Sequence, residues 1–162
     1  MLYEAISESI QELSPWLSFV HPDYSIEDTR ECLSKRDDEL KRGQEYSFAI
    51  YDCRTGTFLG GCGLNDISNE YKIANVGYWV RTNQTKQGIA SAATLLLAKF
   101  AFEELELNRI EIMADIDNKR NQRVAEKVGA KREGILRNRV CFRGNPRDMY
   151  MFSLIPDDLK SQ

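Results

Sequence analysis

The sequence predicts a mixed α/β fold in which antiparallel strands and one parallel strand form a sheet with helices on both faces. The stretch 76–102 runs from strand formers through a polar turn and Gly88 into apolar residues with helical spacing. Residues 46–80 contain three strand patterns joined by two turns, which predicts an antiparallel meander. The helix after Gly88 then leads to a strand pattern at 110–114, and a helical crossover makes that strand parallel to the one before it.

Two helices are predicted before the first strand. The first has apolar residues on one face and is ended by Pro15. The second begins near Ser25, which with Asp28 approximates a capping box, and ends before Gly43 as a surface helix with a narrow apolar stripe. The apolar face of the first helix is Leu2, Ala5, Ile6, Ile10 and Leu13, and the stripe of the second is Ile26, Leu33 and Leu40.

Turn residues divide the rest of the chain into short elements. Thr55-Gly56 separates an alternating strand at 46–50 from a strand at 58–64, whose three glycines predict a bulge or a close backbone approach. A second turn at 66–70 leads to the central strand. Near the C-terminus, Asp117 or Asn118 caps a helix that ends at Gly129, and strands at 135–142 and 148–155 flank a turn at 143–146.

The composition predicts one domain, residues 1–162, with 42% hydrophobic and 29% charged residues. A net charge of −3, with both signs interspersed, disfavours a nucleic-acid partner and suits an amine partner. Four scattered cysteines and the single His21 form no metal-binding set. No secretory signal or apolar run of the ~18 residues needed for a membrane span is present, so we expect a cytoplasmic protein with reduced thiols and no membrane partner.

The start of the helix after Gly88 is the strongest candidate binding site. The first amides of a helix lack intrahelical partners and carry a partial positive charge, so they attract anions. Small residues (Gly88, Ala90, Ser91, Ala92) leave these amides open, and Lys86 and Gln87 add a cation and an amide donor, which suits a pyrophosphate. The alternative is an ordinary strand-to-helix turn.

Two long segments carry a family resemblance. GYWV at 77–80, followed by QTKQGIASAA at 84–93, resembles the acetyl-CoA signature Q/R-x-x-G-x-G/A of the GNAT N-acetyltransferases, with Gln84, Gly88 and Ala90 at the matching positions. Residues 107–137 resemble the RimJ/RimL branch, which acetylates protein N-termini and related amines. Together with PWL at 15–17 and the closing hairpin, the resemblance covers nearly the whole chain.

The resemblance implies a GNAT-like fold, in which the central strand and the next strand splay apart and the pantetheine arm lies between them. It also implies a strand before the first helix, for which this sequence leaves no room, so either that edge strand is absent or the start of the sequence is truncated. Acetyl-CoA is the implied cosubstrate, with no metal. The implied contacts are Trp79, Val80, Arg81, Lys86, Gln87, Gly88, Ile89, Ala90, Ser91 and Asn118.

The family pattern also indicates where chemistry would occur. A Glu commonly precedes the GYW strand and a Ser follows the capping Asn, but here these positions hold Asn75 and Asn121. An Asn amide can orient a group by hydrogen bonding but can neither accept nor give up a proton at neutral pH. Many other GNATs place a Tyr acid where this chain has Ala125. The candidate catalytic residues are Asn118, Asn121, Asn75 and Tyr78, with Tyr150, Glu70 and Asp66 as substitutes that also have packing or turn roles.

The first two helices help to wall the acceptor site in the resembled family. The candidate substrate contacts are therefore Trp16, His21, Tyr24 and Tyr150, with Phe19 nearby, although aromatic packing explains the first three equally well.

These observations predict an N-acetyltransferase in which a primary amine attacks acetyl-CoA directly in a ternary complex, with the backbone amide near Trp79 or Val80 holding the oxyanion. The favoured acceptor is a protein or peptide N-terminus, such as that of a ribosomal protein, and a homodimer is left open. The alternative is an acyl-CoA-binding sensor or protein-interaction module that has lost catalysis. An unrelated nucleotide-binding domain is disfavoured because the sequence lacks both G-x-x-x-x-G-K-[ST] and G-x-G-x-x-G.

Overall fold

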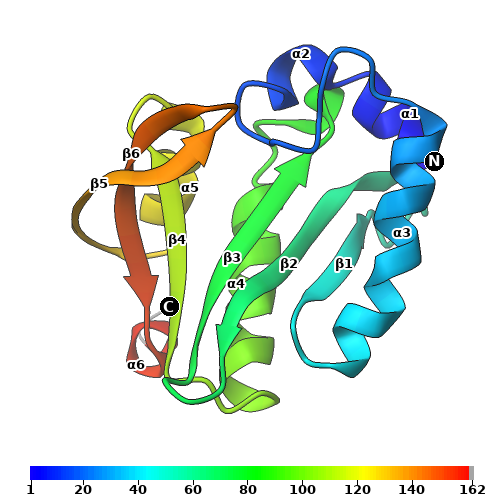
Figure 1. Ribbon diagram of the computed structural model, residues 1–162. Coiled ribbons are helices and arrows are strands. Elements are labelled where there is room, and N and C mark those ends of the chain that lie inside the picture. The colour runs from blue at the N-terminus through cyan, green and yellow to red at the C-terminus, as the bar shows by residue number, and fades with distance from the viewer. Residues whose placement is uncertain (161–162) are drawn as a thin grey trace.

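A six-stranded mixed sheet forms the centre of the computed structural model, which describes residues 1–160 (Figure 1). Neighbouring strands are antiparallel except β3 and β4, which are parallel. The predicted mixed fold and its antiparallel meander are therefore confirmed. The strands lie in the order β1 (Tyr46–Tyr51), β2 (Phe58–Ser68), β3 (Ile73–Val80), β4 (Arg109–Asp115), β6 (Asn145–Leu154) and β5 (Lys131–Phe142).

Helices cover both faces of this sheet. Successive side chains of a strand point to opposite faces, and on β3 Val76 packs into the main core whereas Trp79 packs into a smaller one. The main core lies against α4 (Ile89–Glu103) and α5 (Lys119–Lys127). The smaller core includes Ile6, Val20 and Tyr24. The other helices are α1 (Leu2–Ser7), α2 (Ile10–Leu13), α3 (Ile26–Lys41), the 3-10 turn η1 (Thr82–Gln84) and α6 (Pro156–Leu159).

The parallel strands β3 and β4 pair over three residues only. Ile73, Ala74 and Asn75 lie opposite Arg109, Ile110 and Glu111. Beyond this point β3 continues against β2 as far as Val80, while β4 continues against β6. The two strands therefore diverge toward their C-terminal ends, as the predicted splay requires (Figure 1).

The N-terminal segment differs from the prediction of one continuous helix. The chain forms α1 and α2 separately, with Ser9 at the break. Ser9 is fully buried, and its hydroxyl accepts the backbone N–H of Thr82 at 3.1 Å. A long-range contact with the turn after β3 thus interrupts a helix that the periodicity alone favours. No strand precedes α1 within residues 1–160, and β1 forms the edge of the sheet.

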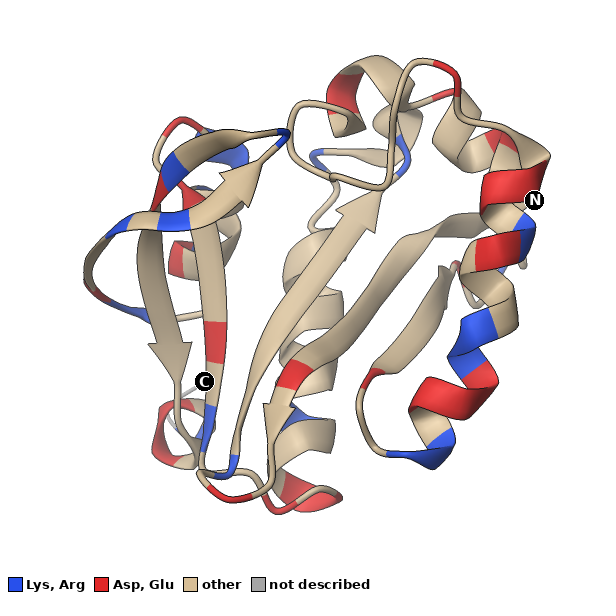
Figure 2. Cartoon of the chain, viewed as in Figure 1, with Lys and Arg blue, Asp and Glu red and all other residues tan. Residues whose placement is uncertain are grey.

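Helix α3 has the predicted capping box at Ser25, but its apolar stripe faces solvent rather than the sheet. Ile26, Leu33 and Leu40 are 44%, 54% and 51% exposed. The side toward β1 is polar, because Arg36 donates hydrogen bonds to Glu45 and to Ser47. Polar contacts, from Arg36 and from the Thr29 hydroxyl to Tyr24, therefore connect α3 to the rest of the fold. Figure 2 shows charges concentrated on this helix, whereas strands β1 to β3 carry almost none.

The C-terminal hairpin is longer than predicted. Its turn consists of Arg143 and Gly144 alone, both with positive φ (49° and 79°), as two-residue hairpin turns favour. Asn145 and Pro146, predicted as turn residues, already belong to β6. Among the helices of residues 1–160, none has both the length and the apolar character needed to cross a membrane.

Candidate active site

A cavity of about 810 Å³ opens where β3 and β4 diverge. The cavity is walled by α2 and the turn after it, by β2 and by the second half of β3. The turn before α4, the first turn of α4, the end of β4, α5 and the C-terminal hairpin complete the wall. Ligand pockets in proteins commonly measure ~300–1,000 Å³, so the cavity can accept an extended small molecule. The splay thus creates the space, and elements far apart in the sequence line it.

One end of the cavity is the N-terminus of α4. Gly88 caps this helix with a φ of 82°, which favours glycine, and no side chain accepts a hydrogen bond from the first amides. Gly88, Ile89, Ala90 and Ser91 border the cavity. A Cβ placed on Gly88 would meet only the Lys127 ammonium, 3.5 Å away. Free amides and an ammonium group face the same space, which is suited to a phosphate group.

The cationic wall of the cavity was only partly predicted. Lys86 borders it as expected, but Arg120, Arg123 and Lys127 of α5 also do so. Their i, i+3, i+7 spacing is a signal that could have shown them on one face of the helix. Of the predicted cofactor contacts, Arg81 and Gln87 lie outside the cavity wall. Arg81 bonds to Glu8 and to the Phe58 carbonyl, and Gln87 donates to Gln84 at 3.2 Å.

The backbone of β3 presents polar groups to the splay. The N–H of Arg81 donates to the Leu59 carbonyl of β2 at 2.8 Å. Because hydrogen-bonded and non-hydrogen-bonded pairs alternate along an antiparallel ladder, Trp79 also faces β2, whereas Tyr78 and Val80 direct their backbone groups away from it. Pairing with β4 ends at Asn75, so within the described chain no strand occupies that edge.

Three of the four candidate catalytic residues are linked by hydrogen bonds beside the splay, through both backbone and side-chain groups. Asn118 caps α5 by accepting the N–H of Asn121 at 3.0 Å. Asn121 in turn donates from Nδ2 to the Met113 carbonyl at 3.1 Å and accepts the Tyr78 hydroxyl on Oδ1. Burial raises the pKa of Tyr78 far above its ordinary value, so this phenol stays protonated. Asn118, Asn121 and Tyr78 all border the cavity.

The fourth candidate, Asn75, lies apart from this chain. Its Nδ2 donates to Oδ1 of Asn65 at 2.8 Å, across the β2–β3 ladder. Its Oδ1 is buried and accepts no hydrogen bond from the described residues. Both amides border the cavity, and the neighbouring Asp66 adds a carboxylate to the same wall.

Only one of the four predicted acceptor contacts borders the cavity. Trp16 does so, together with Trp79. A Cβ on Gly61 would lie only 2.7 Å from Nε1 of the Trp79 indole, so the position of this indole favours glycine at residue 61. Tyr24 is 6% exposed and shares a 2.9 Å hydrogen bond with Thr29 in the smaller core. The other two also lie outside the cavity wall. Nε2 of His21 lies 3.6 Å from Oδ1 of Asp28, and Cζ of Arg132 lies 4.0 Å from the centre of the Tyr150 ring.

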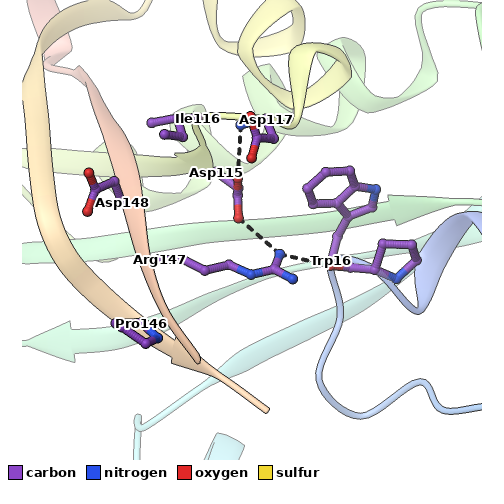
Figure 3. A pocket seen from close by; sticks show the side chains of 8 residues that line it. Trp16, Asp115, Ile116, Asp117, Pro146, Arg147 and Asp148 are labelled. Carbon is purple, nitrogen blue, oxygen red and sulfur yellow. Dashed lines mark hydrogen bonds and ion pairs between the residues drawn. The ribbon is translucent and has the colours of Figure 1, made fainter. Parts of the chain in front are cut away.

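A smaller pocket of about 450 Å³ adjoins the part of the cavity that Trp16 and Arg147 border (Figure 3). It lies between the turn after α2, the end of β4 and the hairpin, and its lining includes Asp115, Asp117 and Asp148. Trp16, Asp115 and Arg147 are the described residues that border both spaces. Arg147 was not predicted, because its place depends on contacts between segments more than 100 residues apart.

Among residues 1–160, none of the four cysteines borders the cavity. Within residues 1–160, no cluster of three or more His, Cys, Asp or Glu side chains could hold a metal ion. Cys62 packs against the main core, and burial raises the pKa of its thiol to about 11, so it stays protonated at neutral pH.

Comparison with known proteins connects this cavity to one family. Residues 3–131 match the model of the acetyltransferase (GNAT) domain. YdaF of Bacillus subtilis, whose name assigns it provisionally as a ribosomal N-acetyltransferase, is 32% identical over 157 residues, covering 95% of this chain and 84% of that protein. The ribosomal-protein-serine acetyltransferase of Escherichia coli is 28% identical over 159 residues, covering 96% and 86%.

The fold agrees with solved structures of this kind. RimL, a ribosomal L7/L12 alpha-N-protein acetyltransferase solved with coenzyme A, superimposes with a TM-score of 0.87 at 23% identity, covering 97% of this chain and 88% of that one. Mycobacterium smegmatis RimJ, solved with a CoA disulfide, gives the same TM-score and identity, covering 98% and 77%.

Proposed function

Because this chain belongs to the GNAT acetyltransferase family, we propose that it transfers the acetyl group of acetyl-CoA to the N-terminal α-amine of a protein or peptide. Acetyl-CoA-dependent N-acetyl transfer itself is common to the family and its named relatives. The observation that carries the proposal is the single cavity that joins an anion site at α4 to the chain of Asn118, Asn121 and Tyr78. The acceptor class is supported by the E. coli relative, whose name assigns it a ribosomal protein as substrate.

The cavity fits acetyl-CoA by charge and by shape. The amides of Gly88 to Ala90 would hold the pyrophosphate, and Lys86 and Lys127 would pair with its negative charge. The backbone edge of β3 at Tyr78 and Val80 would bond the pantetheine arm as an added strand does. The thioester would then lie in the splay, close to Asn118.

The reaction needs little from ionisable side chains. The nitrogen lone pair of a neutral amine attacks the thioester carbon, a C–N bond forms, and the Val80 N–H donates to the oxygen that becomes negative. The C–S bond then breaks, and the sulfur leaves as thiolate and takes up a proton. Tyr78, which borders the cavity, is the candidate donor of this proton and regains it from water. The amine nitrogen releases its excess proton to water. Holding both reactants in place can supply ~7–11 kcal/mol of the barrier, so positioning carries most of the catalysis.

A thiol-release assay tests the proposed function. The protein is incubated with acetyl-CoA and a panel of peptides, polyamines and aminoglycosides while free coenzyme A thiol is measured. We expect release with peptides that have a free N-terminus and little with the other amines. Tight binding of acetyl-CoA without release from any amine would instead favour the acyl-CoA-binding sensor.

Substituting Asn118 by Ala should reduce turnover far more than fold stability. Loss of the helix cap costs ~1 kcal/mol, whereas a misplaced thioester can cost ~10²-fold in rate. Ser25→Ala is the matched control, since Ser25 caps α3 away from the cavity. Thermal melts and steady-state rates of both variants show whether Asn118 acts in the reaction or only as a helix cap. A similar drop in melting temperature with normal turnover in both would leave Asn118 as a cap alone.

Substituting Tyr78 by Phe should lower kcat about tenfold and leave acetyl-CoA affinity unchanged. The loss stays below the ~10²–10⁴-fold typical of a general acid because a thiolate is already a good leaving group. Since the Tyr78 pKa lies above its ordinary value near 10, the wild-type rate should show no decline from its ionisation below about pH 10. Tyr150→Phe, outside the cavity wall, is the control, and equal kinetics for both variants would exclude a role for Tyr78.

A further inference from the structure

Arg147 joins three separate parts of the chain on the acceptor side of the cavity (Figure 3). Its Nη1 donates to the carbonyl oxygen of Pro15 and to Oδ2 of Asp115, each at 3.0 Å. Its Cζ lies 4.1 Å from the centre of the Phe142 ring and 6.0 Å from that of Trp16. One guanidinium therefore links the turn after α2, the end of β4 and the β5–β6 hairpin.

The contact between Arg147 and Asp115 is partly shielded from water. Asp115 is 8% exposed, and its Oδ1 accepts the N–H of Asp117 at 2.9 Å. A buried carboxylate without a cationic partner is costly, so the ion pair with Arg147 holds the Asp115 side chain in place. A second arginine supports the same arrangement, because Arg143 donates to the Val20 carbonyl at 2.7 Å.

The position of Arg147 relates it to the acceptor and not to the anion site. The cations Lys86, Arg120 and Lys127 line the part of the cavity formed by α4 and α5. We expect the amine to reach the thioester from the part of the cavity that Trp16 borders, away from these cations. Arg147 lies there, between the main cavity and the 450 Å³ side pocket.

We propose that Arg147 is a positioning residue for the acceptor: it fixes Trp16 and the hairpin so that the part of the acceptor following its amine enters the side pocket. The inference rests on the proposed function, because it takes the cavity to be the transfer site. Loss of Arg147 then weakens acceptor binding without affecting the acetyl-CoA site.

The test compares Arg147→Met with Arg109→Met. Arg109 is a matched control because it also makes ion pairs, with Glu111 at 2.9 Å and with Glu133 at 2.6 Å, but at the opposite end of β4 and away from both spaces. We expect Arg147→Met to raise the KM for a peptide acceptor about tenfold or more, as loss of a hydrogen bond from a charged group implies. Its KM for acetyl-CoA and its kcat should stay near wild type. Arg147→Lys should recover part of the loss, and Arg109→Met should change neither KM.

An unchanged acceptor KM in folded Arg147→Met protein, or an equal rise in the two KM values, would overturn the proposal. If no peptide is acetylated at all, the proposed function fails. Amide hydrogen exchange then tests whether Arg147 holds the turn after α2 and the hairpin together. Exchange at residues 14–20 and 140–148 should then be faster in Arg147→Met than in wild type and unchanged in Arg109→Met. Equal exchange at these segments in all three proteins would also overturn the proposal.

Discussion

Replacing Gly88 by Asp is expected to lower the affinity for acetyl-CoA at least about a hundredfold. The new carboxylate would lie at the open amides of α4, beside the Lys127 ammonium, where the pyrophosphate is proposed to bind. A like charge ~6 Å away costs about 3 kcal/mol at an effective dielectric constant of ~20, which corresponds to roughly a hundredfold in affinity. Isothermal titration calorimetry with acetyl-CoA measures the loss directly.

Gly88→Ala is the control for this experiment. Both substitutions strain the backbone, since Gly88 has a φ of 82°, and alanine does so at least as much as aspartate. Alanine adds no charge, and its Cβ meets only the end of the flexible Lys127 side chain. We therefore expect a modest loss of stability in both variants and a large loss of affinity in the aspartate variant alone. Unchanged affinity in a folded Gly88→Asp protein would place the pyrophosphate elsewhere.

At pH 7, a peptide with a free N-terminus and a blocked lysine should react several hundredfold faster than the same peptide with a blocked N-terminus and a free lysine. The carboxylate and hydroxyl usual at two positions of the family pattern are replaced by Asn75 and Asn121, so the amine must arrive neutral. An α-amine with a pKa near ~7.8 is roughly 15% neutral at pH 7, whereas a lysine amine near ~10.4 is about 0.04% neutral.

The pH dependence makes this prediction sharper. The rate with the N-terminal peptide should rise with pH and level off above about pH 8, while the lysine peptide should still gain tenfold per pH unit. If the lysine peptide equals or exceeds the N-terminal one at pH 7, a base must act in the cavity. Asp66, the carboxylate that borders it beside Asn75, is then the residue to substitute by Asn.

The sequence predicted most accurately what depends on neighbouring residues. The strand, turn and helix around Gly88 follow from local pattern, and so does the cap at Asn118. The meander and the parallel crossover follow from turn positions and loop length. The resemblance added the splay, which no local pattern of β3 or β4 indicates.

What the sequence did not predict depends on contacts between distant segments. The break at Ser9 depends on its bond to Thr82, and the polar connection of α3 to the rest of the fold depends on Arg36 bonding to Glu45. For the same reason, three of the four residues predicted to contact the acceptor lie outside the cavity wall. Aromatic residues near Trp16 suggested substrate contacts, but Tyr24 is buried in the smaller core, and Arg147 reaches the site from the far end of the chain.

The hydrogen-bond alternation along β3 affects how substitutions at the oxyanion contact would behave. The proposed donor at Val80 is a main-chain group, and every amino acid except proline supplies it. Alanine scanning of β3 would therefore find position 80 tolerant and miss its role in the chemistry. Selection for this donor would act on the neighbouring strand, where a side chain on Gly60 would approach the Trp79 carbonyl to 2.2 Å and displace the backbone that carries it.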